Sequence, residues 1–264
     1  MKKAIVLIML IISLDASEYY SKADPKEVYN IKASVSGEVT FINDKLEGNL
    51  GDGSVVVKID DKIDLLDLKA SKKRLEILLN NLALTRENLK NSKKIAQINR
   101  DNYERVKELS SYSKIQKDAK KLSMINSKNQ ALQTEISVEN LKTQREDLKL
   151  KIEILQDKIK KKNIRVKSGD YIYKIYPNLG DYLNPGSKLM EVYDIQKALL
   201  VIFVPASEIE NIKSKKIYLD GLETDKKIDK IWQVADSINI SSYRVEILID
   251  KPKQFSKLVK IEFR

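Results

Sequence analysis

The chain has 264 residues, of which 33% are charged and only 6% are aromatic, and its formal net charge is +11. It contains no cysteine and no histidine, which excludes thiol nucleophiles, disulfides, zinc sites of the Cys/His type and histidine acid–base catalysis. No spacing of Asp, Glu, Lys and Ser resembles a catalytic site, so we expect neither an enzyme nor a bound cofactor or metal ion.

The first 17 residues have the composition of a signal peptide. Lys2 and Lys3 form a basic start, and the apolar run from Ala4 to Leu14 is short for a membrane span. Cleavage after Ala16 would place Leu14 where a small residue is preferred, so an uncleaved anchor remains an alternative. We therefore expect an exported protein with residues 1–17 as its signal peptide.

One glycine-marked pattern occurs twice, at 36–61 and at 168–194. In each copy, glycine-rich turns separate short runs in which apolar and polar residues alternate, which is typical of β-strands. Each copy has too few strands to bury a face alone, so we predict that the two copies form one small β-sandwich. The turn glycines are Gly37, Gly48 and Gly53 in the first copy and Gly169, Gly180 and Gly186 in the second.

The segment between the copies, 62–163, is predicted to form an antiparallel helical hairpin. Neither Gly nor Pro occurs in the 115 residues 54–168, and the leucines at 68, 75, 82 and 89 recur every seven residues. A cluster of serines predicts the turn at about 109–114, midway along the segment. One continuous helix fits the period equally well, but only a hairpin brings the β copies together.

The predicted inward stripe of the hairpin continues through both arms. Its later members in the first arm include Ile95, Ile98, Tyr103, Val106 and Leu109. In the second arm they are Ile115, Leu122, Ile125, Leu132, Ile136, Leu141, Leu148, Ile152, Leu155 and Ile159.

The C-terminal part, 195–264, is predicted to be a small β-barrel. Five strand candidates and one short helix, 206–213, follow the second glycine-marked copy. An extended segment at 18–30 is expected to join the barrel. The strand candidates are 198–205, 216–221, 227–234, 243–250 and 258–263.

The positive charge does not indicate nucleic-acid binding. Between Asp61 and Lys162 there are 25 Lys and Arg against 15 Asp and Glu, so most of the excess lies in the helical segment. The two signs are interspersed there and aromatic residues are scarce, which indicates a solvated helix surface and no base-stacking platform.

This order of parts resembles the periplasmic adaptor proteins, also called membrane fusion proteins or the hemolysin-secretion (HlyD) family. In that family a lipoyl-like domain is split by an α-helical hairpin and followed by a β-barrel. The halves here would be 31–61 and 164–194, and "ASVSGEV" at 33–39 matches the usual opening. The expected fold is thus an elongated α+β chain.

The resemblance also implies a function. The chain is expected in the periplasm of a Gram-negative envelope, at the inner membrane, where it would link a transporter of the RND or ABC type to a TolC-like outer-membrane channel for efflux or secretion. A homo-oligomeric ring such as a hexamer is implied too. The transporter class, including a possible MFS partner, and the exported substrate stay open.

The hairpin turn carries the candidate contact residues. Family members place Arg, Leu and Ser there with the spacing R-x3-L-x6-S, for contact with the outer-membrane channel. Arg105 and Leu109 keep this spacing, whereas Ser113 comes three residues early. The plainer alternatives are a surface charge for Arg105, a last core layer for Leu109 and a helix N-cap for Ser113.

Two other functions would account for parts of the sequence. "NDKLEG" with Lys45 superficially resembles the modified lysine turn of a lipoyl or biotinyl carrier, but an exported carrier is not expected and Lys45 lies on another loop. A structural coiled-coil protein of the envelope without a transporter partner is the main alternative. A plain coiled coil, however, does not need a duplicated β pattern on both sides.

Overall fold

The computed structural model describes residues 17–236 and 238–264, so the predicted signal peptide lies almost entirely outside the described residues. The chain divides into two compact units. Among the described residues, one unit combines 17–58 with Ile164–Arg264, and the other is Ile59–Asn163. None of the described helices is both long and apolar enough to cross a lipid bilayer.

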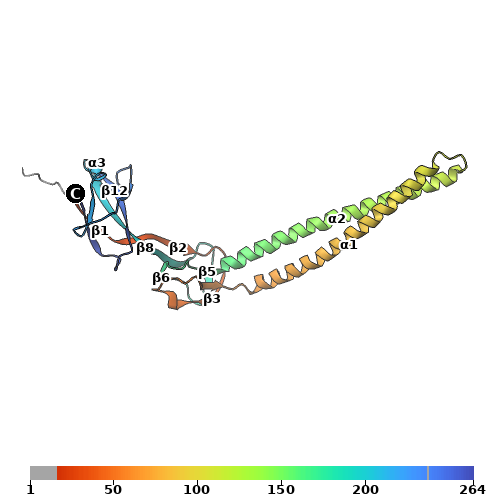
Figure 1. Cartoon of the computed structure of the whole chain (residues 1–264). Helices are drawn as coiled ribbons and strands as arrows, with labels where there is room; N and C mark the ends of the chain where they lie inside the picture. Colours follow the sequence, from red (N-terminus) through yellow and green to blue (C-terminus); the bar gives the residue numbers. More distant parts are fainter. Residues whose placement is uncertain (1–16, 237) are drawn as a thin grey trace, which may run out of the picture. The chain divides into compact units, whose positions relative to one another are not determined.

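The Ile59–Asn163 unit is a hairpin of two long helices, which confirms the prediction (Figure 1). Helix α1 spans Lys62–Val106 and helix α2 spans Lys114–Lys162, with 45 and 49 residues. At about 1.5 Å per residue, each arm is roughly 70 Å long. The turn begins at Lys107, two residues earlier than predicted, and Lys114 is already helical.

The seam between the helices follows a spacing of three and four residues, as in a coiled coil. In α1 it contains the predicted leucines, with Leu78, Leu82 and Val106 buried. In α2 the predicted positions Ile152 and Leu155 are buried near the end of the helix.

The predicted inward stripe is wrong in the half of the hairpin next to the turn. Ile115 is 81% exposed, and Leu122, Leu132 and Ile136 are exposed as well. Smaller or more polar side chains fill the seam instead, because Ala131 and Val138 are the buried residues of this region of α2. The misassigned positions are Ile95 and Ile98 in α1 and Ile115, Leu122, Ile125, Leu132 and Ile136 in α2.

One sheet of the other unit draws strands from both glycine-marked copies. Its order is β5-β4-β3-β7, where β4 (Val55–Ile59) and β3 (Gly37–Ile42) belong to the first copy. Strands β5 (Asn163–Arg165) and β7 (Tyr182–Leu183) come from the end of the helical segment and from the second copy. The two copies therefore contribute to one sheet, with the hairpin inserted between β4 and β5 in the chain.

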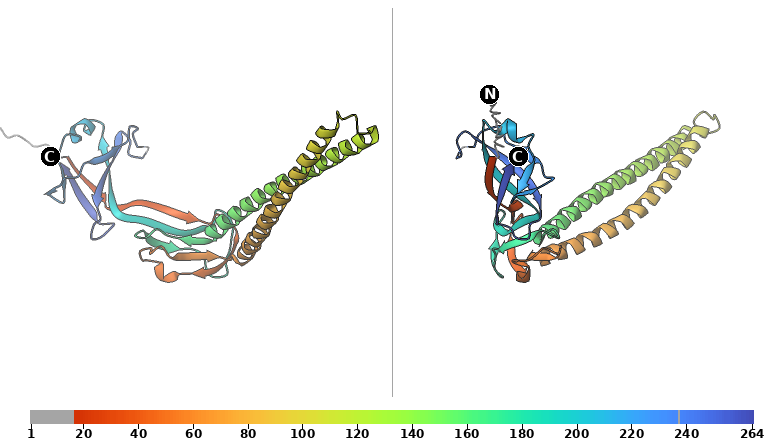
Figure 2. Two further views of the ribbon diagram at one scale, coloured as in Figure 1. Left: turned by 45° about the vertical axis from the view of Figure 1, so that its right-hand side comes forward. Right: turned by 60° about the vertical axis from the view of Figure 1, so that its left-hand side comes forward.

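A second sheet is organised around the long strand β8, Lys188–Pro205. Its order is β11-β12-β8-β2, and β6 (Tyr171–Ile175) pairs with the first half of β8. Strand β2 (Asp24–Lys32) lies along β8, as the views of Figure 2 show. Strand β12 (Ser242–Asp250) pairs with the second half of β8. Strand β11 is Ile228–Ile231.

A third sheet has the order β1-β13-β9-β10. Strand β1 (Ser17–Lys22) pairs with β13 (Leu258–Phe263), so the N-terminal segment joins the C-terminal strands. Strands β9 (Ile217–Leu219) and β10 (Leu222–Glu223) form a short hairpin beside them. The predicted helix is shorter than expected and is reduced to α3, Ile209–Ile212.

The second and third sheets share one core. Its buried members include Leu200 and Ile202 of β8, Ile247 of β12 and Ile261 and Phe263 of β13. All five strand candidates contain or overlap a strand. The candidate 227–234 ends early, however, because β11 stops at Ile231 and leaves Trp232 and Val234 in the following loop.

Candidate functional site at the hairpin turn

The turn between the helices is Lys107–Ser113. The last helical bond of α1 runs from the Lys107 amide to the Tyr103 carbonyl at 3.0 Å. The next bond, from the Leu109 amide to the Val106 carbonyl at 3.1 Å, spans only three residues and tightens the chain. This tighter bond marks the end of α1, because it replaces the four-residue bond of an α-helix.

Ser113 is the N-cap of α2, as the sequence predicts. Its hydroxyl oxygen accepts a hydrogen bond from the Gln116 amide at 3.3 Å, and the Gln116 side chain accepts one from the Ser113 amide at 2.9 Å. This reciprocal arrangement is a capping box, which satisfies two otherwise free amides at the start of the helix. The turn therefore has a defined entry into α2.

Arg105 is held against its own helix. Its Nε donates to the Asp101 carbonyl at 3.3 Å, and an Nη donates to the Asn102 side-chain oxygen at 3.2 Å. Among the described residues, the Arg105 guanidinium forms no ion pair with the carboxylate of Asp101 or Glu108. The guanidinium is thus exposed and is oriented by two neutral acceptors of its own helix.

Leu109 is 46% exposed, so it is not a last core layer; that layer is Val106, which is 8% exposed. Two further exposed apolar side chains flank it, Tyr112 in the turn and Ile115 in the first turn of α2. Neither was predicted from the sequence, because the apolar period places Ile115 in the seam and does not include Tyr112. Three apolar side chains and one arginine at a turn are suited to contact with another protein.

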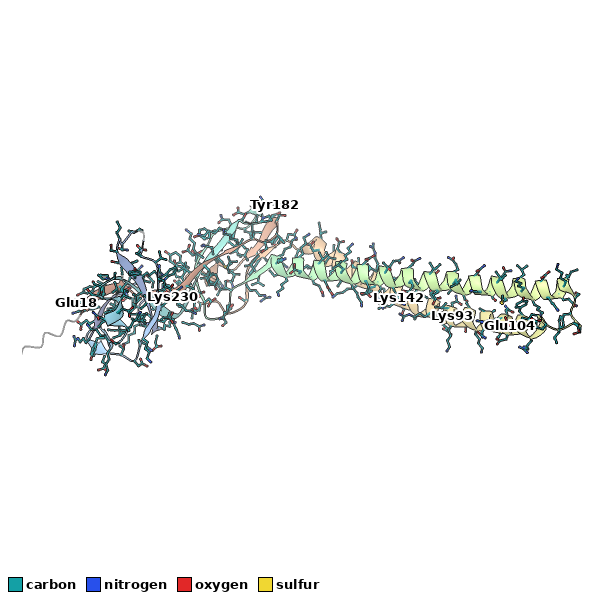
Figure 3. All side chains as sticks on the ribbon, turned by 90° about the horizontal axis from the view of Figure 1, so that it is seen from above. Glu18, Lys93, Glu104, Lys142, Tyr182 and Lys230 are labelled. Atoms are coloured by element: carbon teal, nitrogen blue, oxygen red, sulfur yellow. The ribbon has the colours of Figure 1, made fainter. Side chains whose placement is uncertain are left out.

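Charges next to the turn are paired on the surface. Glu104 and Lys107 form an ion pair at 2.6 Å, and Figure 3 labels Glu104 in this region. The hydrogen bond from Lys107 lowers the pKa of Glu104, and the same bond raises the pKa of Lys107. Both groups are exposed, so this pair contributes little to stability.

The opposite end of the hairpin is joined by a partly buried ion cluster. Asp64 accepts a hydrogen bond from Lys158 at 2.8 Å, and its other oxygen lies 2.6 Å from Lys162 Nζ. Burial raises the pKa of Asp64, but the hydrogen bonds from Lys158 and Lys162 outweigh this effect and leave the pKa below its usual value. The cluster fixes where the two helices start and end relative to each other.

The six predicted turn glycines all adopt positive φ, from 73° at Gly48 to 152° at Gly37. A seventh glycine, Gly51, is buried, and the match between the two glycine-marked copies did not predict its role. A Cβ atom there would lie 2.9 Å from the Lys167 carbonyl oxygen, and the Gly51 carbonyl accepts from the Gly169 amide at 3.0 Å. Close backbone approach between the two copies thus requires glycine at this position. Lys45 lies exposed in the short helix η1, Asp44–Leu46.

No group of three or more Asp and Glu side chains in the described part of the chain could hold a metal ion. The features that stand out are surfaces, namely the turn and the exposed apolar positions along the helices.

No family model matches the sequence, and no curated protein matches it. Solved structures do. The chain is similar to MacA from Actinobacillus actinomycetemcomitans, with 14% identity, a TM-score of 0.63 and coverage of 94% of this chain and 78% of that chain.

Two further solved structures are similar. The membrane fusion protein Spr0693 from Streptococcus pneumoniae R6 has 8% identity and a TM-score of 0.61, and the match covers 94% of this chain and 98% of that chain. A candidate efflux transporter from Bacteroides eggerthii DSM 20697 has 12% identity and a TM-score of 0.56, and the match covers 94% of this chain and 68% of that chain. The chain shares the fold of these proteins, with its long helical hairpin and its β-sheets.

Proposed function

We propose that this chain, which has the membrane fusion protein fold, is a periplasmic adaptor. It would link an inner-membrane transporter to a TolC-like outer-membrane channel, for efflux or secretion across a Gram-negative envelope. The observation that carries the proposal is the sheet β5-β4-β3-β7, which takes strands from both sides of the inserted hairpin. A coiled-coil scaffold without a partner has no need of this construction.

In the proposed domain division, 31–61 and 164–194 are two halves of a lipoyl-like domain around the hairpin 62–163. The support is the close approach of Gly51 to Lys167 and the bond from the Gly169 amide to the Gly51 carbonyl, because both join the halves. The residues 195–264, with 18–30, would form the barrel domain. The pairing of β1 with β13 and the shared core favour this assignment.

The hairpin turn is the proposed contact with the outer-membrane channel. Arg105 would supply an exposed charge and Leu109 an exposed apolar side chain, with Tyr112 and Ile115 beside it. Ser113 already accepts a bond from Gln116, so its hydroxyl hydrogen remains as a donor toward the channel. Its early position would then reflect the tight turn from Lys107 to Ser113.

The hairpins are proposed to pack side by side in a homo-oligomeric ring such as a hexamer. On α2 the exposed residues Ile115, Leu122, Leu132 and Ile136 lie seven, ten and four residues apart, outside the seam between α1 and α2. These intervals are sums of the three- and four-residue steps of a coiled coil. A second apolar stripe at coiled-coil spacing is expected where a third helix packs.

The β parts would dock on a transporter of the RND or ABC type, and the protein's role would be adhesive, without catalysis.

Affinity purification from crosslinked cell envelopes tests the proposal. The tagged full chain should copurify with one inner-membrane transporter and one outer-membrane channel, and a variant lacking the turn charge, Arg105→Ala, should recover less channel at unchanged transporter yield. Lys142→Ala, a change midway along α2, is the matched control. Copurification of neither membrane protein with the wild-type chain would overturn the adaptor function.

A further inference from the structure

The loop between β11 and β12 exposes an unusual group of apolar side chains. Val234, Ile238 and Ile240 are 78%, 87% and 83% exposed. Trp232, at the start of the loop, is 43% exposed. Scattered single apolar residues are normal on a protein surface, but three nearly fully exposed aliphatic side chains and a tryptophan within one loop indicate a binding surface. We call these four residues the apolar loop.

The apolar loop is held by its own hydrogen bonds. One Asp236 carboxylate oxygen accepts from the Ile238 amide at 2.9 Å and from the Asn239 amide at 2.7 Å. The Asp236 amide donates to the Ser242 carbonyl at 2.9 Å, which closes the loop. The conformation that presents the aliphatic side chains to solvent is thus stabilised locally.

Trp232 has the surroundings of a side chain at a membrane–water interface. Its indole N–H donates to Glu246 at 3.2 Å, so the polar end of the ring is satisfied. Lys230 Nζ lies 4.2 Å from the ring centroid, and the Arg244 guanidinium carbon lies 5.6 Å from it (Lys230 is labelled in Figure 3). An anchored tryptophan beside cationic side chains is the combination found where proteins meet lipid headgroups.

A basic hollow of about 610 Å³ runs along β11, directly before the apolar loop. Five lysines line it, against one carboxylate, Asp229. Lys213 and Lys226 are paired with Glu210 and Asp250, so part of this charge is compensated. Lys227 and Lys230 have no ion pair with a carboxylate in the described part of the chain. The lysines are Lys213, Lys215, Lys226, Lys227 and Lys230.

The basic hollow and the tryptophan lie on adjoining surface. A second hollow is lined by Trp232, Gln233 and Tyr243, and it shares Lys213 and Ile231 with the first.

We propose that the apolar loop inserts into the surface of an anionic lipid bilayer, with Lys227 and Lys230 at the headgroups. Apolar insertion with flanking cations is how interfacial segments bind anionic membranes. The proposal goes beyond the adaptor function and does not depend on it.

The test uses Trp232, which is the only tryptophan of the chain. Its fluorescence therefore reports on this loop alone. Cosedimentation with vesicles would also detect binding through the apolar run near the N-terminus. We expect a blue shift of its emission when the full chain meets vesicles of phosphatidylethanolamine and phosphatidylglycerol. Bromine atoms on the acyl chains should quench it, and pure phosphatidylcholine vesicles should bind more weakly.

Three variants and one control separate the apolar and the cationic contributions. Ile238→Asp and Ile240→Asp should each lower the apparent vesicle affinity by about tenfold or more, since burying an aliphatic side chain is worth at least that factor. Lys227→Glu with Lys230→Glu should weaken binding to anionic vesicles only. Leu179→Asp, at a residue 69% exposed in another loop, should bind like the wild type.

The results that overturn the proposal are equally specific. An unchanged Trp232 spectrum of the wild-type chain with anionic vesicles would do so, as would equal binding by the Ile238→Asp variant. If the spectrum is unchanged but loop variants lose a copurifying membrane protein, the apolar loop contacts protein and the lipid proposal is wrong. Circular dichroism of every variant checks that it is folded.

Discussion

Asp64 and Lys162 lie 2.6 Å apart, between the first turn of α1 and the last turn of α2. Their side chains are only 7% and 10% exposed, and Lys162 also donates to the Asp60 carbonyl at 2.5 Å. A buried ion pair contributes to stability only when its remaining polar atoms are satisfied, and here Lys158 Nζ donates a hydrogen bond to the other carboxylate oxygen of Asp64. This contact defines the register of the hairpin at the end opposite its turn.

Removing Asp64 should destabilise the hairpin strongly. We expect Asp64→Ala to lower the free energy of unfolding by about 3 kcal/mol, because it leaves the buried Lys162 charge without its carboxylate partner. Glu76→Ala removes an exposed pair with Lys73 and should cost under about 1 kcal/mol. Urea unfolding followed by helical circular dichroism measures both, and similar losses in the two variants would contradict the structural role of the cluster.

The same carboxylate predicts a pH dependence. Because the pKa of Asp64 is lower in the folded chain than in the unfolded one, the unfolded chain takes up its proton first as the pH falls. The stabilisation by Asp64 is therefore complete above about pH 4, the usual range of an aspartate, and is lost as the pH falls through the lowered pKa. The stability difference between wild type and Asp64→Ala should shrink below that pH, and a difference that instead grew on acidification would contradict this sign.

The capping box should control order at the turn. Ser113→Ala removes the acceptor of the Gln116 amide and should cost about 1 kcal/mol of local stability. Hydrogen exchange at the first amides of α2 should accelerate, while Ser111→Ala, a neighbouring exposed serine of the turn, should leave them unchanged. Equal exchange in both variants would mean that Ser113 does not cap the helix.

The exposed stripe of α2 should affect assembly and leave the hairpin itself intact. Leu132→Gln with Ile136→Gln, at residues 47% and 54% exposed, should keep the unfolding curve but weaken self-association in analytical ultracentrifugation. Val138→Gln, at a residue 3% exposed in the seam, should instead lower the stability of the hairpin by about 2 kcal/mol or more. Loss of stability in the double variant would show that the stripe packs within one chain.

Periodicity predicted the helices well but not which face is buried near the turn. Ile115 and Leu122 lie seven residues apart, as do Ile125 and Leu132, so these large aliphatic residues were assigned to the seam. The seam there is filled by Ala131 and Val138, because the two helices bury smaller side chains between them and leave the large ones outside. Spacing alone cannot distinguish two apolar stripes on one helix.

The β unit shows the same division between local and distant information. Alternating patterns and glycines predicted short strands, and the six turn glycines have the positive φ values that such turns need. Two features depend on contacts between residues that the hairpin separates in the chain. They are the pairing of β4 with β5 and the requirement for Gly51 beside Lys167. No local pattern carries that information. At the turn, Ser113 was predictable as a cap, whereas the exposure of Ile115 was not.

Site-specific photocrosslinking along the hairpin tests the adaptor function most directly. A photoreactive residue would replace Arg105 or Leu109 at the turn, or Lys142 along α2 (Figure 3), in cells with an intact envelope. We predict that positions 105 and 109, at and beside the turn, crosslink to an outer-membrane channel and that position 142 does not. Crosslinks from Lys142 but not from Arg105 or Leu109, or no channel adduct at any position, would contradict the assignment of the turn as the channel contact.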